Sequence, residues 1–202
     1  MAAQTTYSWK TQYGAAGGIV DLAPYAIDTR MNEEDTGTMK FGVGVVVGTH
    51  AGSQVKLPDS EATSADFEGI VTNNRTTEYD LVGKIYIREN AAMGVMRYGR
   101  IYARVATGAT PAYGDPLYLV ISGTDAGCFT EDAEDGIPVK GRFLSAVDGS
   151  TQIAMVELFN QSQVEANIAN IGGIDLSTPA TDGQVLKYDG ASETWKPAAD
   201  ET

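Results

Sequence analysis

Few residues in this sequence have the types and spacing that enzyme chemistry requires. The single histidine, His50, lies in GTHAGSQ, a predicted turn, so a Ser-His-Asp triad or a multi-histidine metal site would depend on that residue alone. The single cysteine, Cys128, lies in DAGCFT without a basic neighbour that would lower the pKa of its thiol. We interpret Cys128 as an inert residue at the start of a strand. The sequence therefore predicts no catalytic residue and a protein that is not an enzyme.

Segments that resemble cofactor or metal motifs lack the flanking sequence or the ligand spacing that such sites need. The glycines of GVGVVVG (42–48) resemble a dinucleotide-binding pattern, but THAGSQVKLP, which follows, does not predict the helix that would hold a pyrophosphate. NEEDTG (32–37) and EDAEDG (131–136) lack the alternating ligand spacing of a calcium loop, so we interpret them as solvated loops. A carboxylate pair for glycoside hydrolysis could come from distant positions, but the sequence nominates none. We predict neither a metal nor a cofactor.

The charge balance is strongly acidic. The chain has 27 Asp and Glu against 14 Lys and Arg, a formal net charge of -13, and no basic stripe. Because phosphate binding depends on clustered cations, we predict no nucleic-acid partner. The acidic surface either keeps the protein soluble or binds a basic partner. No apolar stretch approaches the ~18 residues of a membrane span, and no signal peptide begins the chain, so we expect a soluble protein made in a cytoplasm, with no membrane partner.

The middle of the chain is predicted to be a β-rich body over residues 41–159. Short apolar runs rich in β-branched and aromatic residues alternate with Gly, Pro and Asp, and no helical period separates them. In the run ending at Val105, Ile101 and Ala103 share the predicted inward face, and Tyr102 and Arg104 face solvent or a neighbour. The pattern predicts an all-β sandwich or barrel. The predicted strands are 41–47, 67–72, 83–88, 92–98, 99–105, 115–121, 137–147 and 152–159.

Residues 1–40 differ from this body and are predicted to form an extended N-terminal arm. Aromatic side chains are spread there among Gly, Ala and acidic residues. They either cap the barrel or dock on a partner, because aromatic side chains dominate interface energetics. The candidate contact residues are Tyr7, Trp9, Tyr13 and Tyr25.

The end of the chain predicts two marginal elements. Within a predicted helix and linker over residues 160–175, Val164, Ile168 and Ile171 fall at spacings of four and three, which indicates a short amphipathic helix near 160–171. Residues 176–202 predict a β-hairpin in which Trp195 returns near Tyr188 or Leu186 and Pro197 prevents further central pairing. Neither element is stable alone. The helix packs on its own body or on symmetry copies, and three copies would bury both sets of side chains.

The order of the motifs resembles the decoration, or structural cement, proteins that tailed bacteriophages place on the outside of their heads. The resemblance covers about residues 14–159 and includes GGIVDLAPYAIDTR, FGVGVVVG, VKLP, FEGIVTNN, YGDPLYLV and GRFLSAVDGSTQIAMVELF, in that order. It implies a β-rich module that binds mature capsid shells at junctions between coat subunits, commonly as a trimer, without catalysis. The tail, GIDLSTPATDGQVLKYDGASETWKP, resembles a short motif of phage fibre and head-fibre proteins.

Two functional hypotheses follow. In the first, the chain is a structural virion protein that binds the outer capsid surface as a homotrimer and cements neighbouring coat subunits against internal pressure. Its partner is the major capsid protein, and its tail projects outward. In the alternative, it is a fibre or adhesin whose C-terminal module binds host-surface carbohydrate, with Trp195 and Tyr188 stacking on sugars. The two roles are compatible, since an outward tail could bind glycans or receive another fibre subunit.

Overall fold

Strands make up almost all of the regular structure in the computed structural model, which confirms the all-β prediction. The structure describes residues 14–73, 78–79, 85–134, 136–159, 184–189 and 194–199. The chain divides into two compact units, Met1–Gln161 and Ser162–Thr202. None of the helices among the described residues is long and apolar enough to cross a membrane.

The elements in chain order are β1 (Ala26–Asn32), β2 (Gly44–Val47), β3 (Gln54–Lys56), the 3-10 turn η1 (Ser64–Asp66), β4 (Phe67–Val71), β5 (Glu78–Tyr79), β6 (Ile85–Tyr86), β7 (Ala92–Arg104), β8 (Pro116–Val120), β9 (Phe129–Thr130), β10 (Gly136–Phe143), β11 (Ile153–Leu158), β12 (Gln184–Asp189) and β13 (Thr194–Ala199).

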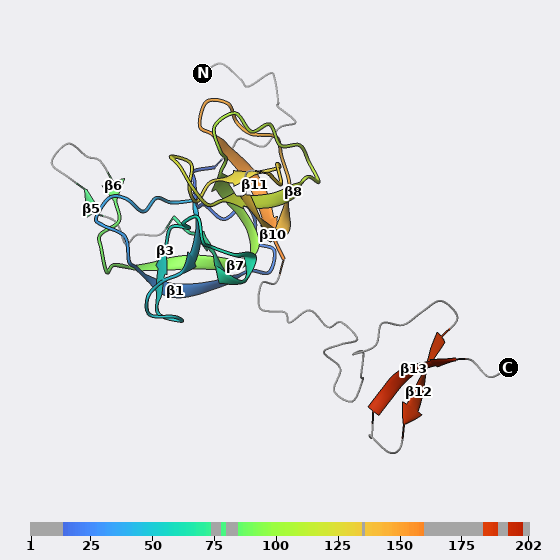
Figure 1. Cartoon of the computed structure of the whole chain (residues 1–202). Helices are drawn as coiled ribbons and strands as arrows, with labels where there is room; N and C mark the ends of the chain where they lie inside the picture. The colour runs from blue at the N-terminus through green and yellow to red at the C-terminus, as the bar shows by residue number, and fades with distance from the viewer. Residues whose placement is uncertain are drawn as a thin grey trace. The chain divides into compact units, whose positions relative to one another are not determined.

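The strands of the first unit form a nine-stranded sheet that closes on itself. Its order is β1-β3-β2-β4-β7-β11-β10-β8-β9. Strand β1 also pairs with β7, and the two strands lie side by side in Figure 1. Five strands, β1, β3, β2, β4 and β7, therefore form a closed ring in which only the β1–β3 pairing is parallel. The short strands β5 and β6 pair separately. Closure leaves this half of the sheet without two long free edges.

The remaining strands form a second group on the other half of β7. There β7 pairs with β11, and the order continues through β10 and β8 to β9. A parallel bridge between Val105 and Phe129 brings β9 back to the end of β7. One strand of 13 residues is thus common to both halves of the sheet.

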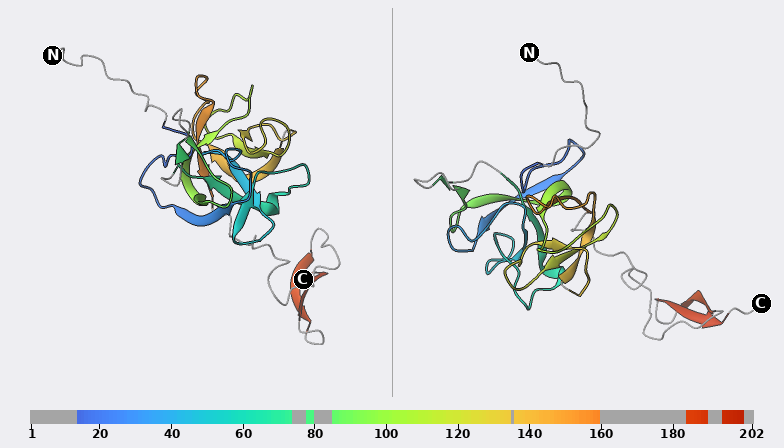
Figure 2. Two further views of the ribbon diagram at one scale, coloured as in Figure 1. Left: turned by 90° about the vertical axis from the view of Figure 1, so that its left-hand side faces the viewer. Right: turned by 90° about the horizontal axis from the view of Figure 1, so that it is seen from above.

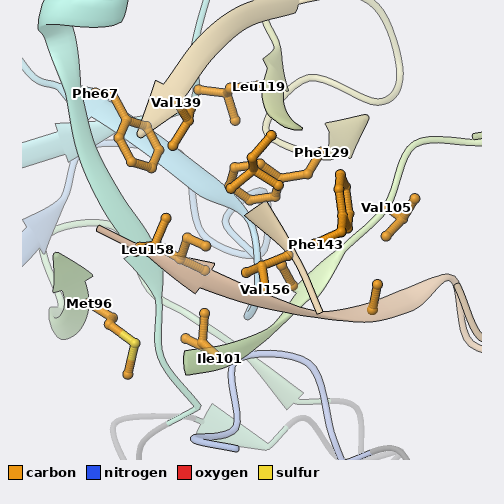
Figure 3. Packing of buried hydrophobic residues seen from close by; sticks show 14 of the residues in the cluster. Phe67, Met96, Ile101, Val105, Leu119, Phe129, Val139, Phe143, Val156 and Leu158 are labelled. Carbon is orange, nitrogen blue, oxygen red and sulfur yellow. The ribbon is translucent and has the colours of Figure 1, made fainter. Parts of the chain in front are cut away.

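Each half surrounds its own hydrophobic core. The core of the five-stranded ring contains Met39, Val43, Val45, Val55, Val71, Ile87, Met93 and Val95. The larger core includes Phe67, which packs edge-on against Phe129 with ring centroids 6.4 Å apart (Figure 3). Strand β2 places Val45 in one core and its neighbour Val46 in the other. Strands between the two cores are buried on both faces, which explains the continuous apolar run that the sequence shows there.

Residues 92–98 and 99–105, predicted as two strands, form the single strand β7. Gly99, the first residue of the second predicted strand, lies inside β7 with φ 122°, a backbone conformation that residues with a side chain disfavour. A Cβ atom at Gly99 would also lie 2.6 Å from the Cβ of Tyr25. The predicted alternation is otherwise present, because Ile101, Ala103 and Val105 are buried in the larger core. Tyr102 is also buried, beneath the chain around Ala16.

The described part of the expected arm belongs to the sheet. Within residues 14–40, β1 pairs antiparallel with β7 and parallel with β3 (Figure 2). The fold therefore has no boundary at Phe41. The remaining arm residues, Tyr7, Trp9 and Tyr13, lie outside the described residues. So do the predicted helix near 160–171 and its side chains Val164, Ile168 and Ile171.

In the second unit, β12 and β13 form the predicted hairpin. Tyr188 is directly opposite Trp195, and their ring centroids are 5.5 Å apart. The backbone of Leu186 pairs with Pro197. The hairpin continues past Pro197 for two further pairs, up to Gln184 with Ala199. That Pro197 prevents pairing of β13 as a central strand stays a prediction. Proline removes only its own N–H donor, and in a two-stranded sheet that position can face away from the partner strand.

The two cores share walls, so we predict that the first unit unfolds in one cooperative transition. Phe129→Ala should lower its free energy of unfolding by about 3–5 kcal/mol, the usual cost of deleting a buried aromatic side chain. Denaturant unfolding followed by far-UV circular dichroism measures this change, and Tyr113→Ala, at a side chain that is 70% exposed, is the control. Two separate transitions, of which Phe129→Ala shifts only one, would contradict a shared scaffold.

Candidate functional site

The two residues whose side chains could take part in catalysis, His50 and Cys128, lie in different parts of the fold. His50 is exposed in the connection between β2 and β3, where its backbone carbonyl accepts hydrogen bonds from the N–H groups of Ser53 and Gln54. Cys128 is half-buried just before β9. Burial, helped by the charge of Asp125, raises the pKa of the Cys128 thiol, although nearby cations act in the opposite direction. A raised pKa disfavours the reactive thiolate.

Acidic residues of the 32–37 cluster form hydrogen bonds with neighbouring loops. The carboxylate of Glu33 accepts hydrogen bonds of 2.6 Å from both the N–H and the hydroxyl of Thr49. The carboxylate of Glu34 accepts one of 2.8 Å from the N–H of Leu57. Among the residues that the structure describes, no group of three or more His, Cys, Asp or Glu is placed to hold a metal ion. The glycine-rich stretch 42–48 contains β2, not the turn before a helix that a nucleotide site needs.

Strand β1 has an inverted side-chain pattern. Its charged residues Asp28 and Arg30 are half-buried, whereas Ile27, Thr29 and Met31 are exposed. In an ordinary half-buried strand the apolar residues face inward, because burying them is favourable and burying charge is costly. The inversion requires compensation on the inner side and exposes apolar surface on the outer side.

Ion pairs across three strands provide the compensation. The guanidinium of Arg30 on β1 lies 3.1 Å from Asp28 and 3.4 Å from Glu68 on β4. The guanidinium of Arg97 on β7 lies 3.2 Å from Asp28. The buried Nε atoms of Arg30 and Arg97 have no hydrogen-bond partner in the described structure. Apart from these two atoms, the network pairs the charged groups of Asp28, Arg30 and Arg97. It stabilises β1 in the register that turns Ile27 and Met31 outward.

The chain before β1 is attached to β7 by its backbone. Gly17 donates a hydrogen bond of 2.7 Å to the carbonyl of Tyr102, and Tyr102 donates one of 2.9 Å to Gly18. Gly17 has φ 76°, and a Cβ atom there would lie 2.6 Å from the backbone nitrogen of Asn73. Only glycine fits this approach without displacement. The attachment holds the residues that follow it against the sheet.

Exposed apolar side chains concentrate on this part of the fold. Of ten exposed large hydrophobic residues in the described structure, five lie between positions 19 and 31, and Leu22 is 97% exposed. A groove of about 400 Å3 includes Ile19, Ile27 and Thr29 in its lining, with Gly94 adding no side chain. Tyr25 was expected from sequence as a contact residue, and the others were not. We call the following set the β1 surface: Ile19, Leu22, Tyr25, Ile27, Met31 and, from the paired region of β7, Tyr98.

Ion pairs attach the chain segment that contains Asp21, between Ile19 and Leu22 of the β1 surface, to strand β7. The guanidinium of Arg100 lies 2.9 Å from Asp21 and donates a hydrogen bond of 3.0 Å from Nε to Glu157 on β11. Arg142 on β10 donates to the other carboxylate oxygen of Glu157 at 2.8 Å. The hydrogen bond from Arg100 is the main cause of the lowered pKa of Asp21. Burial disfavours ionisation of Glu157, but the hydrogen bonds from Arg142 and Arg100 outweigh it and lower its pKa.

Comparison with known proteins assigns a family to this fold. A family model described as "Structural cement protein (E217 gp24/Pam3 gp6)" matches residues 3–159. The chain belongs to the phage structural cement protein family. A chain from a structure titled "The capsid of Myoviridae Phage XM1" has a similar fold, with a TM-score of 0.59 and 18% sequence identity over 78% of this chain and 98% of that chain. No curated protein matches the sequence.

Membership places this cement protein among the structural components of phage capsids, and so in the virion. The role implies that the protein binds the capsid shell. It also agrees with the geometry of the first unit, which is a closed sheet with two cores and an exposed apolar surface.

Replacing Glu157 by Gln should destabilise the cement protein by about 1 kcal/mol at pH 7, because the charged hydrogen bonds from two arginines become weaker. Since the pKa of Glu157 is lowered by folding from 4.5, its stabilising effect is present above that value and is lost as the pH falls through the folded-state pKa. The difference between Glu157→Gln and wild type should therefore shrink below about pH 4.5.

Denaturant unfolding at several pH values measures this effect. Glu61→Gln is the matched control, because Glu61 is exposed and its carboxylate has no hydrogen bond within the described residues. A penalty for Glu157→Gln that stays constant down to pH 3 would show that the charge is not responsible.

Proposed function

We propose that this cement protein binds the outer surface of the phage capsid through the β1 surface and joins neighbouring coat subunits against internal pressure. The observation that carries the proposal is the inversion of β1, in which Asp28 and Arg30 are half-buried while Ile27 and Met31 are exposed. Half-burying charged side chains and exposing apolar ones are both unfavourable for the free protein, so its stability alone does not explain this strand. It is readily explained by a partner that covers those side chains.

The β1 surface has the character of an interface centre. Fully burying a Leu or Ile side chain is worth about 1.5–3 kcal/mol, and aromatic residues are enriched among the residues that dominate binding. Leu22 and Tyr25 are the strongest candidates, with exposures of 97% and 48%. Leu22 lies in the bend that contains Asp21, which is paired with Arg100, and Tyr25 directly precedes β1. The interface would therefore be largely formed before binding, which limits the entropy lost on association.

The arm before the described residues extends this proposed contact. Tyr7, Trp9 and Tyr13 precede the attachment at Gly17 in the sequence, and we propose that they add to the contact made by Tyr25. The surplus of acidic residues supports an outward-facing position, since an acidic surface avoids DNA.

We also propose that the protein is a homotrimer joined by residues after 159, with the tail projecting outward from the shell. The hairpin exposes Tyr188 by 56% and Trp195 by 46%, although their rings pack on each other. A two-stranded hairpin is marginal alone, and three copies could bury these rings together. The helical spacing of Val164, Ile168 and Ile171 supports the same arrangement.

Substitution of Leu22 by Asp tests the shell contact. We expect Leu22→Asp to weaken binding to purified mature shells at least tenfold, because a charge replaces an apolar side chain at the centre of the interface. Its thermal stability should equal that of wild type, since Leu22 is almost fully exposed. Tyr113→Asp, at an exposed aromatic outside the β1 surface, should bind as wild type does.

Co-sedimentation of each variant with shells gives the affinity. Equal binding by Leu22→Asp and wild type would remove the β1 surface from the interface. Failure of the wild type to bind shells would overturn the proposed function itself.

Truncation after residue 159 tests the trimer. We expect the full chain to sediment as a trimer and residues 1–159 to sediment as a monomer in analytical ultracentrifugation, because the marginal elements that need symmetry copies are removed. Trp195→Ala in the full chain should weaken the trimer without changing the melting of the first unit. A truncated protein that remains trimeric would place the trimer contacts in the first unit.

A further inference from the structure

Two cations lie where two pockets of the first unit adjoin. A pocket of about 310 Å3 and another of about 380 Å3 have two lining residues in common, Lys40 and Arg104. Lys40 precedes β2, and Arg104 is the last residue of β7. Neither belongs to the β1 surface or to the ion pairs described above.

Arg104 is held in place by the fold. Its Nε donates a hydrogen bond of 2.9 Å to the carbonyl of Phe41, and its backbone N–H donates one of 2.8 Å to Gly42. On the strand side it is paired with Ile153 of β11. The guanidinium is thus oriented through Nε, and its two terminal nitrogens have no hydrogen bond to the described residues.

Among the described residues, the chain supplies no carboxylate to these two cations. Within the described residues, no carboxylate lies within ion-pair distance of Lys40 or Arg104, whereas Arg30, Lys56, Arg97, Arg100 and Arg142 each have one. This is unexpected in a chain whose acidic residues outnumber its basic ones by 27 to 14. Asp125, the acidic residue in the lining of the first pocket, instead accepts hydrogen bonds from the N–H and hydroxyl of Thr107.

The pocket contents indicate the chemistry of a ligand. Two cations and Asp125 give a net charge of one positive unit, which suits a monoanion better than a phosphate dianion. Met39, Phe41 and Ile87 supply apolar walls next to the cations. Burial is the largest influence on the pKa of Cys128, followed by Asp125, but Arg104 and Lys40 both act to lower it, so both charges reach the pocket. A guanidinium forms its strongest hydrogen bonds with carboxylates.

We propose that Lys40 and Arg104 bind a carboxylate on a short apolar stem, the side chain of a glutamate presented by the capsid shell. This inference rests on the proposed function and adds a polar anchor to the apolar contact of the β1 surface. The carboxylate lies between the two cations, and the methylene groups contact the walls formed by Met39 and Phe41. The recognition is directional, so it helps to set the orientation of the protein on the shell.

Lys40→Met provides the test, with Lys56→Met as the matched control. Both remove one positive charge from an exposed or half-exposed lysine, but Lys56 is paired with Asp59 on its own chain at 2.7 Å. We expect Lys40→Met to bind mature shells roughly tenfold more weakly than wild type, the loss typical of one charge-assisted hydrogen bond. Lys56→Met should bind within about twofold of wild type, as expected for an exposed ion pair outside the interface.

Cys128 reports on the same pocket without a change in sequence, because it is the only cysteine of the chain. Its reaction with uncharged dithiodipyridine should slow severalfold when the wild-type protein is bound to shells. Equal shell affinities for Lys40→Met and Lys56→Met, or a thiol that reacts as fast on shells as in solution, would overturn the carboxylate site. In either case a wild-type protein that still binds shells would leave the proposed function intact, whereas absence of wild-type binding would refute both.

Discussion

The structure depends on one strand that serves two closed groups of strands. Over 13 residues, β7 forms hydrogen bonds with β1 and β4 on one half and with β11 on the other. A strand can do this only if it bends between the halves, and Gly99, with φ 122°, is placed at that point. Because β7 contributes to both cores, the position of each half depends on the other. The two halves of the first unit are therefore tied together by one continuous strand.

The proposed shell contact is a consequence of how the smaller ring closes. The ring needs β1 as its fifth strand, yet the inward side chains of β1 are Asp28 and Arg30. Ion pairs with Glu68 and Arg97 compensate these charges. The apolar side chains of β1 are thereby directed outward. Fold and function are linked here, because the side chains that would stabilise an ordinary barrel from within are displayed on its surface.

Much of the fold could be predicted from the sequence, because alternation along strands such as 99–105 reports burial directly. Strand β1 could not, since an inverted pattern of apolar and charged residues does not indicate which face is buried. Short strands such as β3 and β9 contain too few residues to show a period. Tyr25 could be proposed as a contact residue from the sequence because aromatics are conspicuous in an arm, whereas Lys40 and Arg104 are 64 positions apart and line one pocket only in the folded chain.

The central claim is that the β1 surface faces the capsid shell. A cryo-electron microscopy map of mature shells decorated with the full-length protein tests it most directly. We predict density in which Leu22, Tyr25 and Ile27 contact coat subunits and the β12–β13 hairpin points away from the shell. A map with the β1 surface exposed to solvent, or with the hairpin against the coat, would contradict this account.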